Sequence, residues 1–530
     1  MKKTLLTLTS GLLLASSLTA CATTDISSAQ ALETTSQKEP LVTPLTITDS
    51  ENTQSQSSMD IYSQLTDAVE KASSKNYPDE NEEVDTVITL GSTALNSIEI
   101  LGENVLNQDG NILIQSGGSY MFTGNFNGQI LIDTDDEDVQ LLLYNLHLEN
   151  DQDAPISIIK ADEVTITLMS GTQNSIIDNS PYHEEDSSVD VRSNGAIFSK
   201  DDLAINGDGN LTIVSEYKSG ILGKDDVLIL GGNIDIQSPR NGIKGNDLVY
   251  ISDGVIDISA GTDGIESVTL VCIDGGNTTI HESYEGIEAL DIIINDGNID
   301  ITASDDAINI SGSLTDADGT LVEALATSTA NLSTTNQNFG RGQNHPESLT
   351  GHGLYINGGE LTANSYGDGL DSNGNFWMSG GTVVVDGPET DREGSLDADL
   401  NFQVTGGELL AVGSSGMMRN PDAQSTVNTL SVAFDQFYSA GTHIAILDEN
   451  LNTVAEYTPE KSFASIIYVS PQLQLNETYT ITIDGNVLDT YELTETISTF
   501  GSQSSHGGRG TRPAGGPKDD RRPPNTDTNS

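Results

Sequence analysis

The sequence predicts an all-β chain whose body is a right-handed parallel β-helix, a solenoid with coils of about 22 residues. Three observations lead to this prediction. Glycines recur every 22 residues, apolar residues alternate with a period of two between them, and no helical apolar pattern of useful length separates the strands. The first four of these corner glycines are Gly220, Gly242, Gly264 and Gly286.

Each coil is expected to carry strands with one buried face. One column of inward-facing residues consists of Val227, Val249, Val271, Ile292, Leu354, Phe376 and Phe402. The next strand of each coil supplies a second column: Ile234, Ile256, Thr278, Ile299, Leu361, Val383 and Leu409. Branched aliphatic residues in register from coil to coil are typical of a solenoid core.

Changes of composition set the boundaries of the β-helix at 83–424, with a polar insertion at 311–351. The segment 425–498 keeps strand patterns without the repeat, which predicts a small β module or a cap over the last coil. The segment 21–82 is rich in Ser, Thr, Gln and acidic residues and is predicted to be a disordered tether. The Gly-, Arg- and Pro-rich segment 499–530 is predicted to be a disordered tail.

Residues 1–20 have the charged start and apolar stretch of a signal peptide. The segment ends in Leu18-Thr19-Ala20-Cys21, which resembles a bacterial lipobox. Lipidation of Cys21 would hold the protein on the extracellular side of a bacterial membrane. The alternative is an ordinary secretion signal with a chance cysteine.

The chain is strongly acidic, with 80 Asp and Glu against 21 Lys and Arg and a net charge of −59. Nucleic acid is excluded as a partner, because a phosphate backbone needs a basic surface. The charge also disfavours an anionic membrane surface, so we expect membrane contact only through the lipid. An acidic polymer could bind only with cations between the two surfaces.

The residues around the corner glycines form two acidic columns. One residue before the corner lie Ser219, Asn241, Asp263, Glu285, Asp306 and Asp368, and two residues after it lie Leu222, Lys244, Glu266, Glu288, Asn309, Asp371 and Asp397. Stacked strands lie ~4.8 Å apart, so these carboxylates repel one another unless cations separate them. Oxygen-only ligands favour Ca²⁺. The candidate ligands are Asp263, Glu266, Glu285, Glu288, Asp305, Asp306, Asn309, Asp368 and Asp371. The alternative is an acidic, solvated edge.

A third, apolar column faces outward: Leu228, Tyr250, Cys272, Ile293, Tyr355 and Trp377. An apolar stripe of this length needs an explanation in a soluble protein. Either the 425–498 module or the insertion covers it, or its rings stack on sugars. Tyr250 and Trp377 are therefore candidate sugar contacts, together with Lys244 in the acidic column.

At the corners the sequence resembles the calcium-binding β-helix carbohydrate-binding proteins of bacterial surfaces. The resemblance lies in stretches such as Ser283-Tyr284-Glu285-Gly286-Ile287-Glu288 and Gly367-Asp368-Gly369-Leu370-Asp371-Ser372-Asn373-Gly374. That family binds cellulose and pectin-type polymers and is distantly related in structure to polysaccharide lyases. The chain departs from the family at Ala307 and Asn309 and in the length of its insertion.

The resemblance implies a surface-anchored, calcium-dependent, non-catalytic protein that binds pectin-like or cellulose-like polysaccharide. Two alternatives stay open. A calcium-dependent polysaccharide lyase would need a base, for which Lys244 is the only credible candidate, although a Lys among carboxylates is held protonated. A structural adhesin would bind protein rather than sugar.

Overall fold

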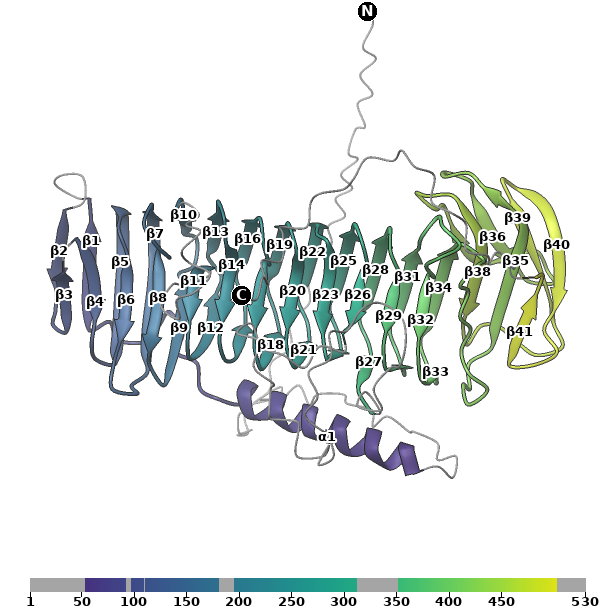
Figure 1. Ribbon diagram of the computed structural model, residues 1–530, viewed down its shortest axis with the longest axis horizontal. Coiled ribbons are helices and arrows are strands. Elements are labelled where there is room, and N and C mark those ends of the chain that lie inside the picture. The colour runs from purple at the N-terminus through teal and green to yellow at the C-terminus, as the bar shows by residue number, and fades with distance from the viewer. Residues whose placement is uncertain (1–52, 92–96, 109, 181–194, 312–350, 503–530) are drawn as a thin grey trace, which may run out of the picture. The chain divides into compact units, whose positions relative to one another are not determined.

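The computed structural model of the protein describes residues 53–91, 97–108, 110–180, 195–311 and 351–502 (Figure 1). All of these described residues belong to one compact unit of the chain, within residues 45–530. The predicted signal peptide, Cys21, residues 21–52 of the predicted tether, most of the insertion and most of the tail lie outside the described residues. Among those that are described, no helix is long and apolar enough to cross a membrane.

The described chain is nearly all β and stacks its strands in three parallel rows, which confirms the predicted parallel β-helix. The first row, which we call the ladder face, carries the acidic columns: β4 (Asn111–Ile114), β6 (Ile130–Asp133), β8 (Ile156–Lys160), β11 (Gly195–Ser199), β14 (Ser219–Gly223), β17 (Ile243–Gly245), β20 (Asp263–Ser267), β23 (Glu285–Ala289), β26 (Ile308–Ile310), β29 (Leu370–Ser372) and β32 (Leu396–Ala398). The second row, the helix face, lies under a helix: β9 (Glu163–Leu168), β12 (Asp202–Gly207), β15 (Val227–Ile229), β18 (Leu248–Ile251), β21 (Leu270–Ile273), β24 (Asp291–Ile294), β27 (Gly353–Ile356), β30 (Asn375–Met378) and β33 (Phe402–Val404).

The third face consists of β10 (Gln173–Asp178), β13 (Asn210–Ser215), β16 (Asn233–Ser238), β19 (Val255–Ala260), β22 (Asn277–Glu282), β25 (Asn298–Ala303), β28 (Glu360–Ser365), β31 (Thr382–Asp386) and β34 (Glu408–Gly413). At the N-terminal end, β1 (Thr86–Leu90) lies between the antiparallel β2 (Ile98–Leu101) and the parallel β5 (Gly118–Asn127). There, β3 (Val105–Gln108) pairs antiparallel with β4, and β7 (Val139–Asn150) is long enough to pair with both β9 and β10.

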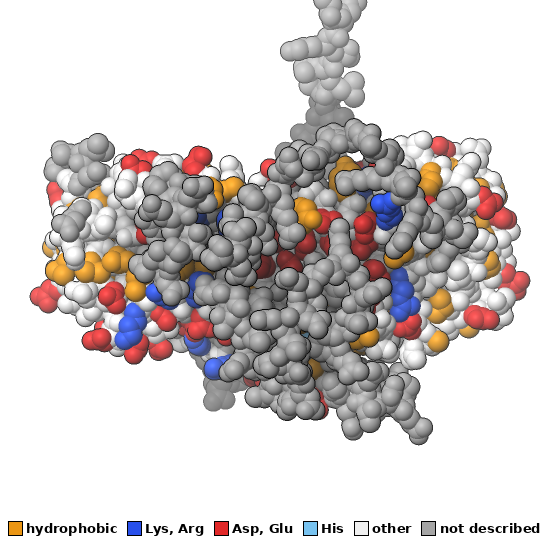
Figure 2. Space-filling model, viewed as in Figure 1, with side chains coloured by type: hydrophobic (Ala, Val, Ile, Leu, Met, Phe, Trp, Pro, Cys, Tyr) orange, Lys and Arg blue, Asp and Glu red, His pale blue; other side chains and the backbone are white. Residues whose placement is uncertain are grey.

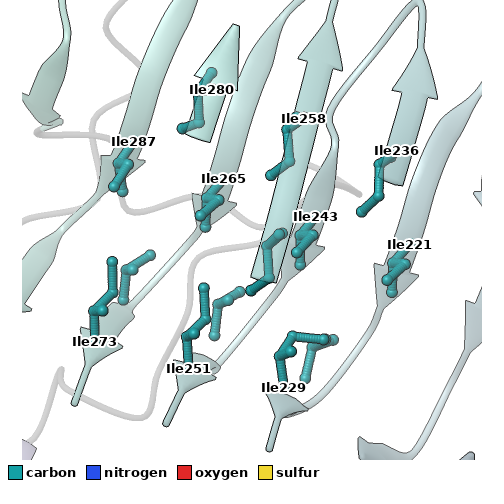
Figure 3. Packing of buried hydrophobic residues seen from close by; sticks show 14 of the residues in the cluster. Ile221, Ile229, Ile236, Ile243, Ile251, Ile258, Ile265, Ile273, Ile280 and Ile287 are labelled. Atoms are coloured by element: carbon teal, nitrogen blue, oxygen red, sulfur yellow. The ribbon is translucent and has the colours of Figure 1, made fainter. Parts of the chain in front are cut away.

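The core is built from aliphatic columns that run from coil to coil. Figure 3 shows three of them, one from each face, with Ile221, Ile229 and Ile236 in one coil stacked against their counterparts in the next. All three side chains are fully buried. The columns predicted from the sequence pair as expected, for example Val249 with Val271 and Ile256 with Thr278. Burial of repeated aliphatic residues is therefore the main favourable contribution to folding of the solenoid.

The corner glycines are required by close packing between coils. A side chain added at Gly264 would meet the Gly286 carbonyl oxygen at 2.7 Å and the Ile280 Cδ1 atom at 2.6 Å. The backbone of β20 therefore packs closely against the next coil at this point, with Gly264 and Ile265 buried and Asp263 and Glu266 on the partly exposed outer side. The two acidic columns thus lie on either side of the glycine column.

The C-terminal segment forms the predicted β module. The last solenoid strand, β34, pairs antiparallel with β38 (Phe463–Val469), which also pairs with β35 (Thr429–Tyr438). In addition, β41 (Ile497–Phe500) pairs in parallel with β35 and adds a strand to this sheet. A four-stranded sheet follows in the order β37 (Thr453–Tyr457), β36 (Ile444–Leu447), β39 (Thr478–Ile483) and β40 (Asn486–Glu492). The module has its own apolar core around Phe463, Tyr479 and Ile481.

The prediction of a disordered tether over 21–82 is wrong for part of that segment, because residues 53–73 form the helix α1 (Thr53–Ser73). Ile61, Leu65, Val69 and Ala72 share one side of α1 and pack against the outward apolar column. The column is therefore covered by α1, which was not among the covers predicted. The 425–498 module is not part of this cluster, and most of the insertion, the other predicted cover, lies outside the described residues. The spacing of these four residues is that of an amphipathic helix.

Candidate functional site

The acidic columns stand in register on the ladder face. Asp263 pairs with Glu285, and Glu266 pairs with Glu288. The second column continues from Glu288 through Asn309 and Asp371 to Asp397. The predicted columns are thus confirmed as a geometric arrangement, and Figure 2 shows acidic side chains gathered near the centre of one face of the molecule.

The first cluster consists of Asp263, Glu266 and Glu288, whose nearest carboxylate oxygens all lie within 4.8 Å of one another. Burial and the charge of Glu266 raise the pKa of Asp263 well above its usual value. The nearest cation is Lys244, whose Nζ donates a hydrogen bond to Glu266 Oε1 at 2.5 Å. Asn241 Nδ2 donates to Asp263 Oδ2 at 3.0 Å. One Lys charge among three carboxylates leaves this cluster with a net negative charge.

The second cluster consists of Asp368, Asp371 and Asp397, again with carboxylate oxygens within 4.8 Å of one another. Burial and the charge of Asp306 raise the pKa of Asp371 to about 9. Burial is also the main reason why the pKa of Asp368 rises to about 8, even though the Gly394 amide donates a hydrogen bond to its carboxylate. Asp368 and Asp371 therefore hold their protons tightly, mainly because they are buried and also because their neighbours are negative.

The remaining candidates lie beside or between the two clusters. Asn309 Nδ2 donates to Glu285 Oε2 at 2.5 Å, while Asn309 Oδ1 is buried and accepts no hydrogen bond within the described structure. Burial and the charge of Glu288 raise the pKa of Glu285 to about 8. Asp306 Oδ1 accepts a hydrogen bond from the Asp368 amide at 2.6 Å. Asp305 is part of the turn beside this column and not of either cluster.

The donor set fits a hard cation. Both clusters offer only oxygen ligands, and Asn309 Oδ1 is a buried acceptor without a donor. Buried polar atoms normally have partners, so such an orphaned oxygen is a position that a cation could satisfy. Asp263, Glu266, Glu288, Asp368, Asp371 and Asp397 are the residues that could hold metal ions.

The aromatic candidates are not in this site. Tyr250 is 6% exposed and Trp377 is 4% exposed, because both lie under α1. The Tyr250 hydroxyl donates to Asp274 Oδ2 at 2.9 Å. Their prediction as sugar contacts is wrong for this structure, since a sugar ring has no access to either face. Lys244 does lie in the ladder, bound to Glu266.

The predicted ligand set leaves out two features. Asp397, which the sequence already places in the acidic column, completes the second cluster, although its coil has Ser395 in place of the corner glycine. A third acidic group, Asp202, Asp225 and Asp226, lies at the turns leading into the helix face. It already contains a cation, because Lys75 Nζ, just after α1, lies 2.5 Å from Asp202 Oδ2.

The comparisons with known proteins bear on residues 108–391, which match the model of a family described as carbohydrate-binding domain-containing protein. This match covers more than half of the chain. The chain belongs to this carbohydrate-binding domain family. The matched segment includes the first cluster and, in the second, Asp368 and Asp371.

Two relatives of this carbohydrate-binding domain protein are similar to parts of it. A carbohydrate-binding domain-containing protein of Acetivibrio thermocellus is 34% identical over 158 residues, which are 29% of this chain and 54% of the relative. The chain thus spans about half the length of that curated relative. A solved structure, described as the polysaccharide lyase-like protein from C. thermocellum in a gadolinium derivative, is 32% identical. The match covers 42% of this chain and 91% of that one, with a TM-score of 0.37.

Proposed function

We propose that this protein is a calcium-dependent, non-catalytic polysaccharide-binding β-helix that is anchored by lipid outside a bacterial membrane. Family membership supports carbohydrate as the ligand. The net charge of −59 makes direct contact with an acidic polysaccharide unfavourable. A cation held on the ladder face removes that obstacle, and it would also accept the hydroxyl oxygens of a neutral polymer.

The observation that carries the proposal is the cluster of Asp368, Asp371 and Asp397. Burial, and after it the charges of neighbouring carboxylates such as Asp306 and Asp368, raise the pKa of Asp371 to about 9. A fold that places three carboxylates within 4.8 Å of one another, on a partly buried edge, is strained by repulsion unless a cation is present. Carboxylate ligands at such spacing suit Ca²⁺, which accepts irregular geometry and several oxygen donors.

The protein's own residues have three tasks in this account. The carboxylates of the two clusters hold the ions, the corner glycines keep consecutive coils close enough to share a ligand set, and Asn309 offers a neutral oxygen between the clusters. A bound Ca²⁺ supplies a positive charge and coordination positions for ligand oxygens. Asp305, at the adjacent turn, would lie near the ligand without being needed for the metal.

The non-catalytic part of the proposal rests on Lys244. A lyase of this architecture needs a base that removes a proton next to a uronate carboxylate. Lys244 Nζ lies 2.5 Å from Glu266 Oε1 and is committed to this ion pair, so it is not free to act on a substrate.

The anchoring part of the proposal rests on the lipobox, which ends at Cys21. In the native host or a bacterial expression host, the wild-type chain should appear in the membrane fraction. Cys21→Ser should move it to the soluble extracytoplasmic fraction without changing its melting temperature. Wild-type protein that is already soluble would contradict the anchor and leave the binding proposal intact.

Binding itself is tested by affinity gel electrophoresis through pectate and through hydroxyethylcellulose. We expect retardation of the wild type in calcium and free migration in excess chelator. Asp368→Asn/Asp371→Asn should lose most of the retardation. Asp235→Asn/Asp300→Asn removes the same number of charges from exposed positions on the third face and should bind as the wild type does. Equal migration of all variants with and without calcium would contradict the proposal.

A further inference from the structure

Two exposed tyrosines lie at the turn that precedes the ladder. Tyr284 is 47% exposed and immediately precedes Glu285, while Tyr366 is 61% exposed and lies two residues before Asp368. Their turns belong to one stack, because the Tyr284 carbonyl accepts a hydrogen bond from the Asp305 amide at 2.8 Å, and the Asp305 carbonyl accepts one from the Gly367 amide at 2.9 Å. The tyrosines are therefore two coils apart, roughly 10 Å along the solenoid.

The carboxylates of the ladder lie directly beside these rings. A side chain added at Gly367 would collide with the carboxylate oxygens of Asp305 and Asp306, so both carboxylates rest against the backbone next to Tyr366. On the other side, Glu285 follows Tyr284 without an intervening residue. Aromatic rings and carboxylate oxygens thus alternate along one edge of the fold.

The ring of Tyr366 is held in place by the C-terminal module. Lys461 Nζ lies 5.0 Å from the centroid of the Tyr366 ring, in the geometry of a cation–π contact. Lys461 is itself buried and donates hydrogen bonds to the backbone carbonyls of Asp386, at 2.7 Å, and of Ser365. A ring fixed in this way loses little conformational entropy when a ligand stacks on its exposed side.

A similar arrangement occurs farther along the same edge. Tyr217 precedes its corner glycine by three residues, as Tyr366 does, and the Arg240 guanidinium carbon lies 5.9 Å from its ring centroid. Tyr217 is only half-buried. The turn therefore presents a tyrosine that contacts a cation at two levels, and Tyr284, which is 47% exposed, lies between them.

The geometry points to Tyr284 and Tyr366 as a stacking platform for pyranose rings of a polysaccharide that runs along the solenoid edge beside the acidic ladder. This inference rests on the proposed function and names the part of the surface that contacts the sugar. Tyrosine suits the task because its face packs on sugar C–H groups while its hydroxyl reaches sugar oxygens or water. A protein partner is disfavoured, because the two rings are separated by the turn of Asp305 and do not form a continuous apolar patch.

The test measures the affinity for pectate and for hydroxyethylcellulose at saturating calcium, by affinity electrophoresis and by calorimetry. We expect Tyr284→Ala and Tyr366→Ala each to weaken binding of at least one polymer by about tenfold, the size of one aromatic contact. Phe at the same positions should restore most of the affinity. Tyr144→Ala is the matched control, because Tyr144 on β7 is 46% exposed and remote in sequence from the ladder. Calcium binding and melting temperature should be unchanged in all five variants.

A second readout is the tyrosine ultraviolet difference spectrum on addition of pectate. It should be clear for the wild type and nearly absent for Tyr284→Ala/Tyr366→Ala. Wild-type affinity in both alanine variants overturns the platform and leaves the proposed function standing. Equal losses in the Phe and Ala variants also overturn it, because the ring is then not what binds. Failure of the wild type to bind either polymer refutes the proposed function, and the platform with it.

Discussion

The ring of Tyr62 on α1 lies 4.7 Å from the ring of Tyr355, centroid to centroid, and Tyr355 in turn stacks on Trp377 at 4.6 Å. The helix thus closes an aromatic column on the outside of the β-helix. Lys75, just beyond the helix, holds the other end through Asp202 and through Glu163, at 3.3 Å. This contact assigns the outward column to a structural role and leaves the ladder face as the candidate binding surface.

The docking of α1 is testable through the single tryptophan of the chain. Leu65→Ala removes a side chain that is 2% exposed, which should weaken the docked helix by about 2–4 kcal/mol. We expect the emission of Trp377 to shift to longer wavelength and to become more sensitive to acrylamide. Met59→Ala changes an exposed residue of the same helix and should leave both properties unchanged. An unaltered Trp377 in the Leu65 variant would mean that α1 does not cover it.

The acidic group beside Lys75 predicts a pH dependence of stability. Burial and the charge of Asp202 raise the pKa of Asp226 to about 7. The folded protein therefore binds this proton more tightly than the unfolded chain does, and the free energy of unfolding should fall as the pH rises from about 4 to about 7. Asp226→Asn should remove part of this slope, on the order of 1–3 kcal/mol over the interval. Urea unfolding at each pH measures it, and equal slopes for wild type and variant would contradict the assignment.

The ladder predicts that one substitution has opposite effects with and without calcium. Because the pKa of Asp371 is about 9, folding at pH 7 without metal requires this carboxyl group to take up a proton. Asp371→Asn should therefore stabilise the metal-free protein at pH 7, on the order of 1–3 kcal/mol, and should have little effect at pH 4. In calcium, the wild type should gain ~2.7 kcal/mol per site at 100 times the dissociation constant, and the variant should gain less.

Asp300→Asn is the control for that experiment, since Asp300 is exposed on the third face. It should change neither the metal-free stability nor the gain from calcium. Thermal unfolding in chelator and in calcium gives both quantities. A destabilised metal-free Asp371→Asn protein would show that the carboxylate makes favourable contacts, and the repulsion argument would then be wrong.

The ion pair of Lys244 predicts an absence of lyase activity. Incubation with pectate or alginate in calcium should give no unsaturated uronate product, which is followed by its ultraviolet absorbance. Lys244→Ala should also give no product. The same substitution should change calcium binding, because Glu266 loses its ion-pair partner. Steady product formation by the wild type that is lost in Lys244→Ala would replace the non-catalytic proposal with a lyase.

Much of the fold could be predicted because consecutive coils of a solenoid repeat the same residue pattern, so the structural period is visible in the sequence. Each inward position, such as Val249 or Ile256, meets the same position of the next coil, so apolar identity and spacing are repeated together. The acidic columns could be placed for the same reason. Their pairing, from Glu266 through Glu288 to Asn309, follows from counting residues after each corner glycine.

The helix α1 was harder to predict because the apolar column that it packs against is formed by residues far away in the sequence. Along the part of α1 whose side chains are described, Ile61, Leu65, Val69 and Ala72 are buried against the solenoid, with Tyr62 partly buried beside them. The residues around them are mostly polar, like those of a solvated linker. The buried residues are spaced four, four and three positions apart, and this spacing is the available signal. Burial of Tyr250 and Trp377 depends on that helix, so their role could not be assigned from strand alternation alone.

The central claim is that calcium on the ladder links the protein to its polysaccharide, and calorimetry of pectate binding over a range of calcium concentrations tests it most directly. The account predicts that pectate affinity rises with calcium, and that saturating pectate raises calcium affinity by the same factor, because coupled binding is reciprocal. The effect should be largely lost in Asp368→Asn/Asp371→Asn. Pectate affinity that is the same in calcium and in chelator would contradict the account and leave the ladder as a solvated acidic edge.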